Sequence, residues 1–196
     1  MKEKIIFAPS ANGTELLRFM ARKGKNTIGC RVMNGIELAE FVLMKAGVFI
    51  DAKYIRTNEA AALIYGFLDE IKHFSYASFS DAVNIASTLR EVRMLIPENE
   101  TEIMHKKLKN GKFPDNSAAL LEVYDRYIAE LKKQGFIDDI QLIRKAVEVG
   151  YMIDAELITL KEHPLTPLEI RLGVYVKAVP KLTGETADAA IYHIEV

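Results

Sequence analysis

The sequence predicts an α/β fold in which a parallel sheet is interrupted by a large helical insertion. Two short apolar segments near the N-terminus, each followed by a helical pattern, indicate consecutive β-α units. From residue 56 to residue 150 one helical pattern follows another, and strand-like segments return only after that point. We therefore expect a sheet domain formed by residues 1–55 and 151–196, and a helical insertion formed by residues 56–150.

The first β-α unit contains the main candidate binding loop. Residues 4–7 form a short apolar run, small and turn-forming residues follow, and residues 14–23 have apolar side chains at helical spacing. In a parallel sheet, such a loop brings the N–H groups at the start of a helix to the carboxyl edge of the strand, where an anion can bind. The candidate anion-binding residues are Ser10, Ala11, Asn12, Gly13 and Thr14.

This loop is a degraded form of the phosphate-binding pattern G-x-x-x-x-G-K-[ST], or Walker A motif. Alignment on Gly13 places Ala8 at the first glycine, Thr14 at the lysine and Glu15 at the hydroxyl residue that holds magnesium. The lysine charge is therefore missing, and the Glu15 carboxylate would repel a triphosphate. We expect no catalytic residues here and no ATP or magnesium cofactor, and an ordinary strand-turn-helix corner is the simpler interpretation.

The other elements follow from caps and periodicity. A strand is expected over residues 27–32, and Asn34 is a suitable N-cap for a helix over residues 35–45. Within the insertion, helices are expected over residues 58–73, 81–95 after Ser80, 100–109, 117–134 and 137–149. A strand over residues 155–160, a helix over 167–179 that begins with a Thr166–Glu169 capping box, and a strand over 189–196 complete the sheet domain.

Composition limits the functional classes without choosing one. The chain has 196 residues, 49% of them hydrophobic and 27% charged, which is enough to bury a core. A net charge of −1 gives no overall attraction to nucleic acid or to an anionic membrane, so such binding needs a local patch. The single cysteine, Cys30, excludes an internal disulfide, and no apolar run reaches membrane-spanning length. We expect a cytoplasmic protein that does not bind membranes.

One basic cluster is the candidate for contact with nucleic acid. Its lysines follow Arg90 and Arg93 in the sequence, and they are Lys106, Lys107, Lys109 and Lys112. Acidic residues precede them on the same predicted helix, and the helix dipole favours that distribution on any exposed helix. Tyr124 and Tyr127 interleave with leucines at core spacing, so we expect them in the core. The four histidines lack metal-ligand spacing, and no metal site is expected.

The order of these segments resembles the N-terminal part of AddB-type subunits of bacterial helicase-nucleases. Residues 5–13 look like the first helicase strand and a degraded phosphate loop, and residues 31–39 are similar to the next strand and helix. Residues 121–127 and 135–143 look like the helical insertion, in which a tyrosine-bearing helix precedes an acidic helix start. The resemblance implies a superfamily 1, P-loop-helicase-like sheet domain, with a PD-(D/E)XK nuclease domain far downstream, in an ATP-dependent helicase and exonuclease.

The chain departs from active helicases of this class at a second motif. Residues 159–162 read Thr-Leu-Lys-Glu, without the paired acidic residues that bind metal in the Walker B motif. The resemblance therefore implies a non-catalytic domain that acts in DNA repair and recombination. It would be a scaffold for single-stranded or duplex-end DNA and for a helicase subunit of the AddA type.

Two alternatives stay open at the level of sequence. One is a small phosphate- or nucleotide-binding α/β protein that uses residues 10–14 as an anion nest. The other is a helical protein-interaction module without a ligand of its own. The strand pattern at residues 189–196 further predicts that the chain is the leading piece of a longer polypeptide, and that an uncovered sheet edge causes weak self-association.

Overall fold

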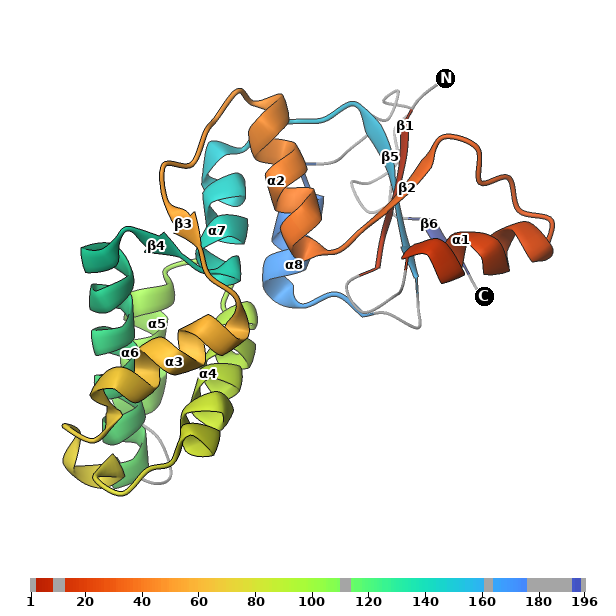
Figure 1. Cartoon of the computed structure of the whole chain (residues 1–196). Coiled ribbons are helices and arrows are strands. Elements are labelled where there is room, and N and C mark those ends of the chain that lie inside the picture. Colours follow the sequence, from red (N-terminus) through yellow and green to blue (C-terminus); the bar gives the residue numbers. More distant parts are fainter. Residues whose placement is uncertain (1–2, 9–12, 110–113, 161–163, 176–191, 195–196) are drawn as a thin grey trace. The chain divides into compact units, whose positions relative to one another are not determined.

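The computed structural model describes residues 3–8, 13–109, 114–160, 164–175 and 192–194. Over these residues the protein is a mixed α/β structure with a small parallel sheet and many helices (Figure 1), which confirms the predicted α/β class. The chain divides into two compact units. We call Met1–Phe49 with Leu142–Val196 the sheet unit, and Ile50–Gln141 the helical unit.

In the part of the sheet unit that the structure describes, four parallel strands lie in the order β2-β1-β5-β6. These strands are β1 (Glu3–Phe7), β2 (Cys30–Met33), β5 (Ala155–Leu160) and β6 (Tyr192–Ile194). In the register, Ile5 lies between Arg31 of β2 and Leu157 of β5. Strand β1 is therefore internal to the sheet. One of its two partners, β5, follows the helical unit in the sequence.

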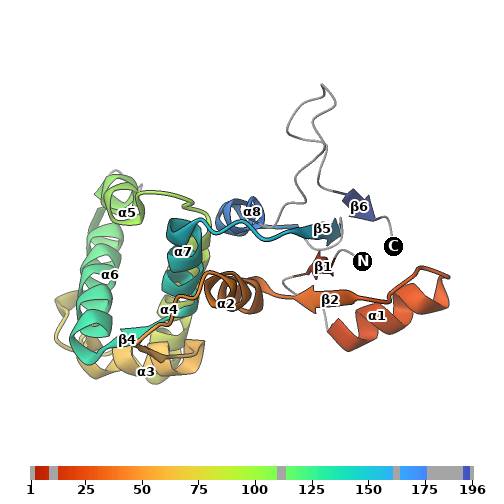
Figure 2. The ribbon, with the colours of Figure 1, turned by 90° about the horizontal axis from the view of Figure 1, so that it is seen from above.

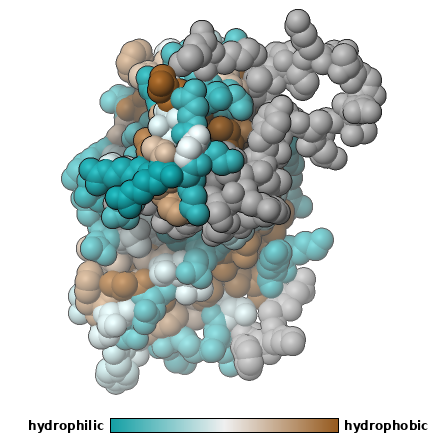
Figure 3. All heavy atoms as spheres, turned by 90° about the vertical axis from the view of Figure 1, so that its right-hand side faces the viewer, coloured by the Kyte–Doolittle hydropathy of each residue, from teal (hydrophilic) through white to brown (hydrophobic). Residues whose placement is uncertain are grey.

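Helices cover both faces of this sheet, as Figures 1 and 2 show: α1 (Gly13–Arg22) lies on one side, and α2 (Gly35–Lys45) and α8 (Pro167–Gly173) lie on the other. Leu16 and Met20 of α1 pack in one cluster with Ile6, Ala8 and Ile158. The surface on the side that carries α1 is mainly hydrophilic, and a few hydrophobic residues lie among the hydrophilic ones (Figure 3). This is the amphipathic pattern of a helix that shields one face of a sheet.

Local capping explains why α2 and α8 begin where the sequence predicts. Asn34 Oδ1 accepts the backbone N–H of Glu37 at 3.0 Å, and the Glu37 carboxylate accepts the backbone N–H of Asn34 at 2.9 Å. Thr166 and Glu169 form the same reciprocal capping box at the start of α8. Each box satisfies N–H groups that the helix itself cannot pair, so the predicted start of each helix is confirmed.

Within the described residues, the helical unit contains four α-helices and the first turn of a fifth. They are α3 (Thr57–Leu68), α4 (Phe79–Met94), α5 (Glu100–Lys109), α6 (Pro114–Gln134) and the first turn of α7 (Asp139–Val149). A short 3-10 helix, η1 (Lys72–Phe74), joins α3 to α4. The two-residue strands β3 (Lys53–Tyr54) and β4 (Phe136–Ile137) pair in parallel, so the first and last segments of this unit are hydrogen-bonded to each other.

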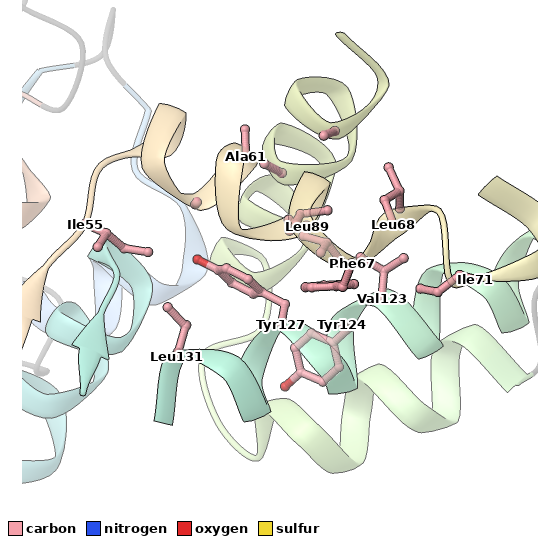
Figure 4. Packing of buried hydrophobic residues seen from close by; sticks show 14 of the residues in the cluster. Ile55, Ala61, Phe67, Leu68, Ile71, Leu89, Val123, Tyr124, Tyr127 and Leu131 are labelled. Atoms are coloured by element: carbon pink, nitrogen blue, oxygen red, sulfur yellow. The ribbon is translucent and has the colours of Figure 1, made fainter. Parts of the chain in front are cut away.

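The core of the helical unit forms between α3, α4, α5 and α6 (Figure 4). Tyr124 and Tyr127 of α6 are 2% and 3% exposed, which confirms their predicted place in the core. Their rings pack among the apolar side chains of the cluster, and their hydroxyls point in different directions (Figure 4). Each buried hydroxyl needs a hydrogen-bond partner, and this need shapes the site described below.

Several predicted boundaries are wrong, for local reasons. Helix α4 begins at Phe79 because Ser78, and not Ser80, forms a capping box with Asp81. Helix α3 ends at Leu68 and not near residue 73, and η1 forms separately after Ile71. Strand β2 begins at Cys30 because a turn with Gly29 at φ 74° precedes it. The expected helix end near residue 179 and most of the strand at 189–196 fall outside the described residues.

No helix in the described part of the chain combines the length and apolar character needed to cross a membrane.

Candidate functional site

The predicted anion-binding loop lies between β1 and α1. Ser10, Ala11 and Asn12 are outside the described residues, while Gly13 and Thr14 are the first two residues of α1. A Cβ atom on Gly13 would come within 3.1 Å of Val32 Cβ, so the start of α1 lies tightly against β2. Glu15 lies in the first turn of α1 and is exposed. A negative charge therefore occupies the end of the helix that an incoming phosphate would approach.

The basic cluster occupies the last turn of α5. Lys106, Lys107 and Lys109 are all exposed there, and Lys112 lies outside the described residues. Lys109 lines an open groove of about 640 Å³ between α5 and α6 together with Glu122, Asp125 and Arg126. Carboxylates and cations both line this groove, so its charge is mixed. Lys106, Lys107 and Lys109 are thus grouped at the end of α5.

The two arginines that precede this cluster in sequence are engaged elsewhere. Arg90 donates from Nε to Asp139 Oδ2 at 2.5 Å, and Arg93 is only 2% exposed. Neither side chain therefore extends the basic surface of α5. Arg93 is instead the centre of a buried ionic network that the sequence analysis did not identify.

The network joins four helices through Arg93. The guanidinium donates from Nη1 to Asp138 Oδ2 at 2.5 Å, from Nη2 to Asp138 Oδ1 at 3.3 Å, and from Nε to Glu100 Oε1 at 2.5 Å. The Tyr127 hydroxyl donates to Asp138 Oδ2 at 2.9 Å, and the Tyr124 hydroxyl donates to Glu100 Oε1 at 3.1 Å. The buried tyrosine hydroxyls of Figure 4 thus find their partners in this network.

Asp138 also caps α7. Its Oδ1 accepts the backbone N–H of Gln141 at 2.8 Å, which is the bond expected from an N-cap residue. The carboxylate therefore accepts hydrogen bonds from Arg93, Tyr127 and the start of α7. With its oxygens occupied in this way, Asp138 is suited to hold structure together and is not available as a general base for a substrate.

The protonation states follow from burial and charge. Burial by itself would raise the pKa of Asp138, but the Arg93 charge and the hydrogen bonds from Arg93, Gln141 and Tyr127 hold it below its usual value. Burial would lower the pKa of Arg93, but Asp138 and Glu100 raise it further above its usual range. Burial raises the pKa of Tyr124 to about 12. At neutral pH the network therefore contains a charged Arg93 beside a charged Asp138, with neutral tyrosines around them.

A small cavity adjoins this network. It holds about 20 Å³ and is lined by residues that include Arg56, Thr57, Arg93, Tyr127 and Asp139. A space of that size accommodates about one water molecule and no substrate. The network is therefore a structural feature of the helical unit, and the strongly perturbed pKa values in it do not mark a catalytic site.

A sequence signal for this network does exist. Ala82, Ala86, Leu89 and Arg93 are all buried on α4, and their spacing is that of one helix face. Periodicity alone places Arg93 on the apolar side of the helix, and a buried arginine requires a carboxylate partner. The partner itself is 45 residues away, beyond the reach of any local pattern.

Within the described residues, no group of three His, Cys, Asp or Glu side chains is arranged to hold a metal ion. No protein-family model matches the chain. A search of curated proteins also finds no match, so the functional assignment depends on the residues and geometry above.

Proposed function

We propose that this chain is a non-catalytic, P-loop-helicase-like domain of an AddB-type subunit, which acts in the cytoplasm in DNA repair and recombination. In this role it serves as a scaffold for single-stranded or duplex-end DNA and for a helicase subunit of the AddA type. Its nucleotide loop is degenerate, so it neither binds ATP with magnesium nor hydrolyses ATP.

One observation carries the proposal: the helical unit is inserted between two adjacent strands of the sheet. Strand β5 pairs with β1 from Glu3↔Ala155 to Phe7↔Thr159, although all of the helical unit separates them in sequence. A parallel sheet with a strand-loop-helix corner and a long helical insertion is the arrangement that the resemblance to AddB-type subunits implies. The acidic helix start of that resemblance corresponds to Asp138 and Asp139 at the beginning of α7.

The DNA-binding part of the proposal is tested with a fluorescent oligo-dT and anisotropy over about 50 to 200 mM salt. We expect the unmodified chain to bind, and the double variant Lys106→Ala/Lys109→Ala to bind more weakly. The slope of log K against log salt should fall by about one unit for each lysine that contacts a phosphate.

The matched control is Lys132→Ala, because Lys132 is also an exposed lysine at the end of a helix. It should leave affinity and salt slope unchanged. An identical salt slope in the unmodified chain and the double variant would mean that the α5 lysines are an ordinary solvated helix end. Absence of oligo-dT binding by the unmodified chain would remove DNA from the proposed role.

A second candidate function is a small phosphate- or nucleotide-binding α/β protein. Its support is the position of Gly13 and Thr14 at the start of a helix that directly follows an internal parallel strand. A titration with inorganic phosphate distinguishes the two candidate functions. It is followed by NMR through the amide resonances of Gly13 and Thr14. Saturable shifts at these amides, together with absent oligo-dT binding, would favour the second function.

A further inference from the structure

Three aromatic side chains of the helical unit are exposed on its surface and do not belong to its core. Tyr65 of α3 and Phe79 at the start of α4 are each 47% exposed, and their rings meet edge to face with centroids 5.7 Å apart. Tyr76, three residues before Phe79, is 101% exposed. Single exposed apolar residues are common on protein surfaces, but aromatic residues in mutual contact form a continuous patch.

The patch continues along one face of α3. Ala62, Tyr65, Gly66 and Asp69 are all exposed and follow the i, i+3, i+4, i+7 spacing that places residues on one side of a helix. Asp69, the C-cap residue, is the only charged member of this set. Between Glu59 and Asp69 the helix has no charged side chain, whereas a helix face that is solvated throughout normally carries charged side chains in every turn.

Gly66 is an independent sign of close contact with another chain. A Cβ atom at this position would meet nothing within 4 Å, so the fold itself does not require a glycine. Glycine inside a helix costs roughly 0.5–1 kcal/mol relative to alanine. Together with Ala62, one turn earlier, it leaves the backbone of α3 accessible, and small residues spaced in this way allow two helices to approach closely.

Charge indicates what kind of partner fits. Residues 58–82 contain four carboxylates (Glu59, Asp69, Glu70 and Asp81) and one lysine (Lys72); Glu70 pairs with Arg126, and Asp81 accepts hydrogen bonds in the capping box of α4. Asp69 lies one turn beyond Tyr65, and Asp81 lies two residues after Phe79. Aromatic faces bordered by carboxylates attract lysine and arginine side chains. The same carboxylates would repel phosphates. A surface that binds single-stranded nucleic acid instead combines its aromatic side chains with a basic groove.

We propose that the face of α3 formed by Ala62, Tyr65, Gly66 and Asp69, with Phe79 and Tyr76 at its edge, binds a lysine- or arginine-bearing α-helix of a partner protein. The partner helix lies against Ala62 and Gly66, and its cations contact the aromatic rings and Asp69. This inference concerns the helical unit alone and does not rest on DNA binding or on the degenerate nucleotide loop.

The test uses the full chain and two labelled alanine-based helical peptides of about 20 residues, one with regularly spaced lysines and one with glutamates at the same positions. Fluorescence anisotropy gives the affinities. We expect the lysine peptide to bind the unmodified chain at least about tenfold more tightly than the glutamate peptide. Gly66→Leu, which places bulk where the helices meet, and Asp69→Lys, which reverses the charge, should each weaken lysine-peptide binding by about tenfold.

The matched control is Ala129→Leu, which adds the same bulk at an exposed position of α6 and should not change binding. Gly66→Leu should fold at least as stably as the unmodified chain, because leucine favours the helix and nothing lies near its Cβ. Equal affinity for the two peptides, or unchanged binding in Gly66→Leu, would overturn the proposal. If Tyr65→Ala abolished oligo-dT binding, the proposal would also be overturned, because the patch would then be a base-stacking surface.

Discussion

Arg93 and Asp138 lie 45 residues apart in the sequence and form a bidentate ion pair in the core of the helical unit, with the shorter contact at 2.5 Å. Arg93 is 2% exposed and Asp138 is 3% exposed. The pair connects the end of α4 to the start of α7, and Glu100, Tyr124 and Tyr127 complete its hydrogen bonds. Because Arg93, Asp138 and both tyrosines are buried and the Glu100 side chain is only 9% exposed, the loss of one group leaves another without compensation.

We predict that Asp138→Ala destabilises the protein by about 3–5 kcal/mol, the range found when one member of a buried ion pair is removed. The variant leaves Arg93 charged and without its main partner, and it also removes the cap of α7. Urea unfolding followed by circular dichroism measures the change. The control Glu130→Gln removes a carboxylate from the surface pair with Lys133, and it should leave stability nearly unchanged.

The same ion pair predicts a loss of stability in acid. The pKa of Asp138 is held below its usual value in the folded state, so its contribution is complete above the unfolded value of about 3.9. It decreases as the pH falls through the lower, folded pKa. Urea unfolding at a series of pH values below 5 should show a smaller acid-dependent decrease for Asp138→Asn than for the unmodified chain. Parallel pH profiles would show that Asp138 is not a source of acid sensitivity.

Tyr124 predicts a loss of stability in alkali. Burial raises its pKa to about 12, above the unfolded value of about 10. The neutral form is therefore favoured in the folded state, so the contribution of Tyr124 to stability is constant below pH 10 and declines as the pH rises from about 10 to about 12. Tyr124→Phe should reduce this alkaline decline, measured by thermal unfolding across that range. Tyr76→Phe is the control, because Tyr76 is fully exposed and should leave the profile unchanged.

The capping box of α2 offers a test in the sheet unit. Asn34→Ala removes the side-chain acceptor for the Glu37 N–H, and we expect a destabilisation of about 1 kcal/mol. Asn34→Ser retains an acceptor and should recover most of the loss. If the alanine and serine variants have the same stability, the cap bond contributes little to α2.

ATP binding tests the degenerate loop. Thr14 stands where the loop lysine would be, and Glu15 places a negative charge in the first turn of α1. We expect no ATP hydrolysis and at most weak binding of ATP with magnesium, as measured by an enzyme-coupled assay and by titration calorimetry. Micromolar affinity in the unmodified chain would contradict this interpretation of the loop.

The caps and apolar strands could be predicted because their chemistry is local. Helix α2 begins as predicted because Asn34 and Glu37 are three residues apart and form their bonds without help from distant segments. Strand β5 has the predicted bounds because its alternating, partly apolar pattern is sufficient to specify a strand. The core position of Tyr124 and Tyr127 likewise follows from helical spacing on α6.

Tertiary structure alone decided the roles of the charged residues and of the two-residue strands. Arg93 was grouped with the surface lysines in the sequence analysis, but it is buried because Asp138 and Glu100 come from other helices to compensate its charge. Strands β3 and β4 exist because Lys53 and Ile55 meet the segment at Gly135 to Ile137, which the intervening helices bring alongside them. Local sequence specifies the elements that residues within a few positions can stabilise. The fold determined which distant groups meet, because desolvating a charge is tolerable only where a partner is in place.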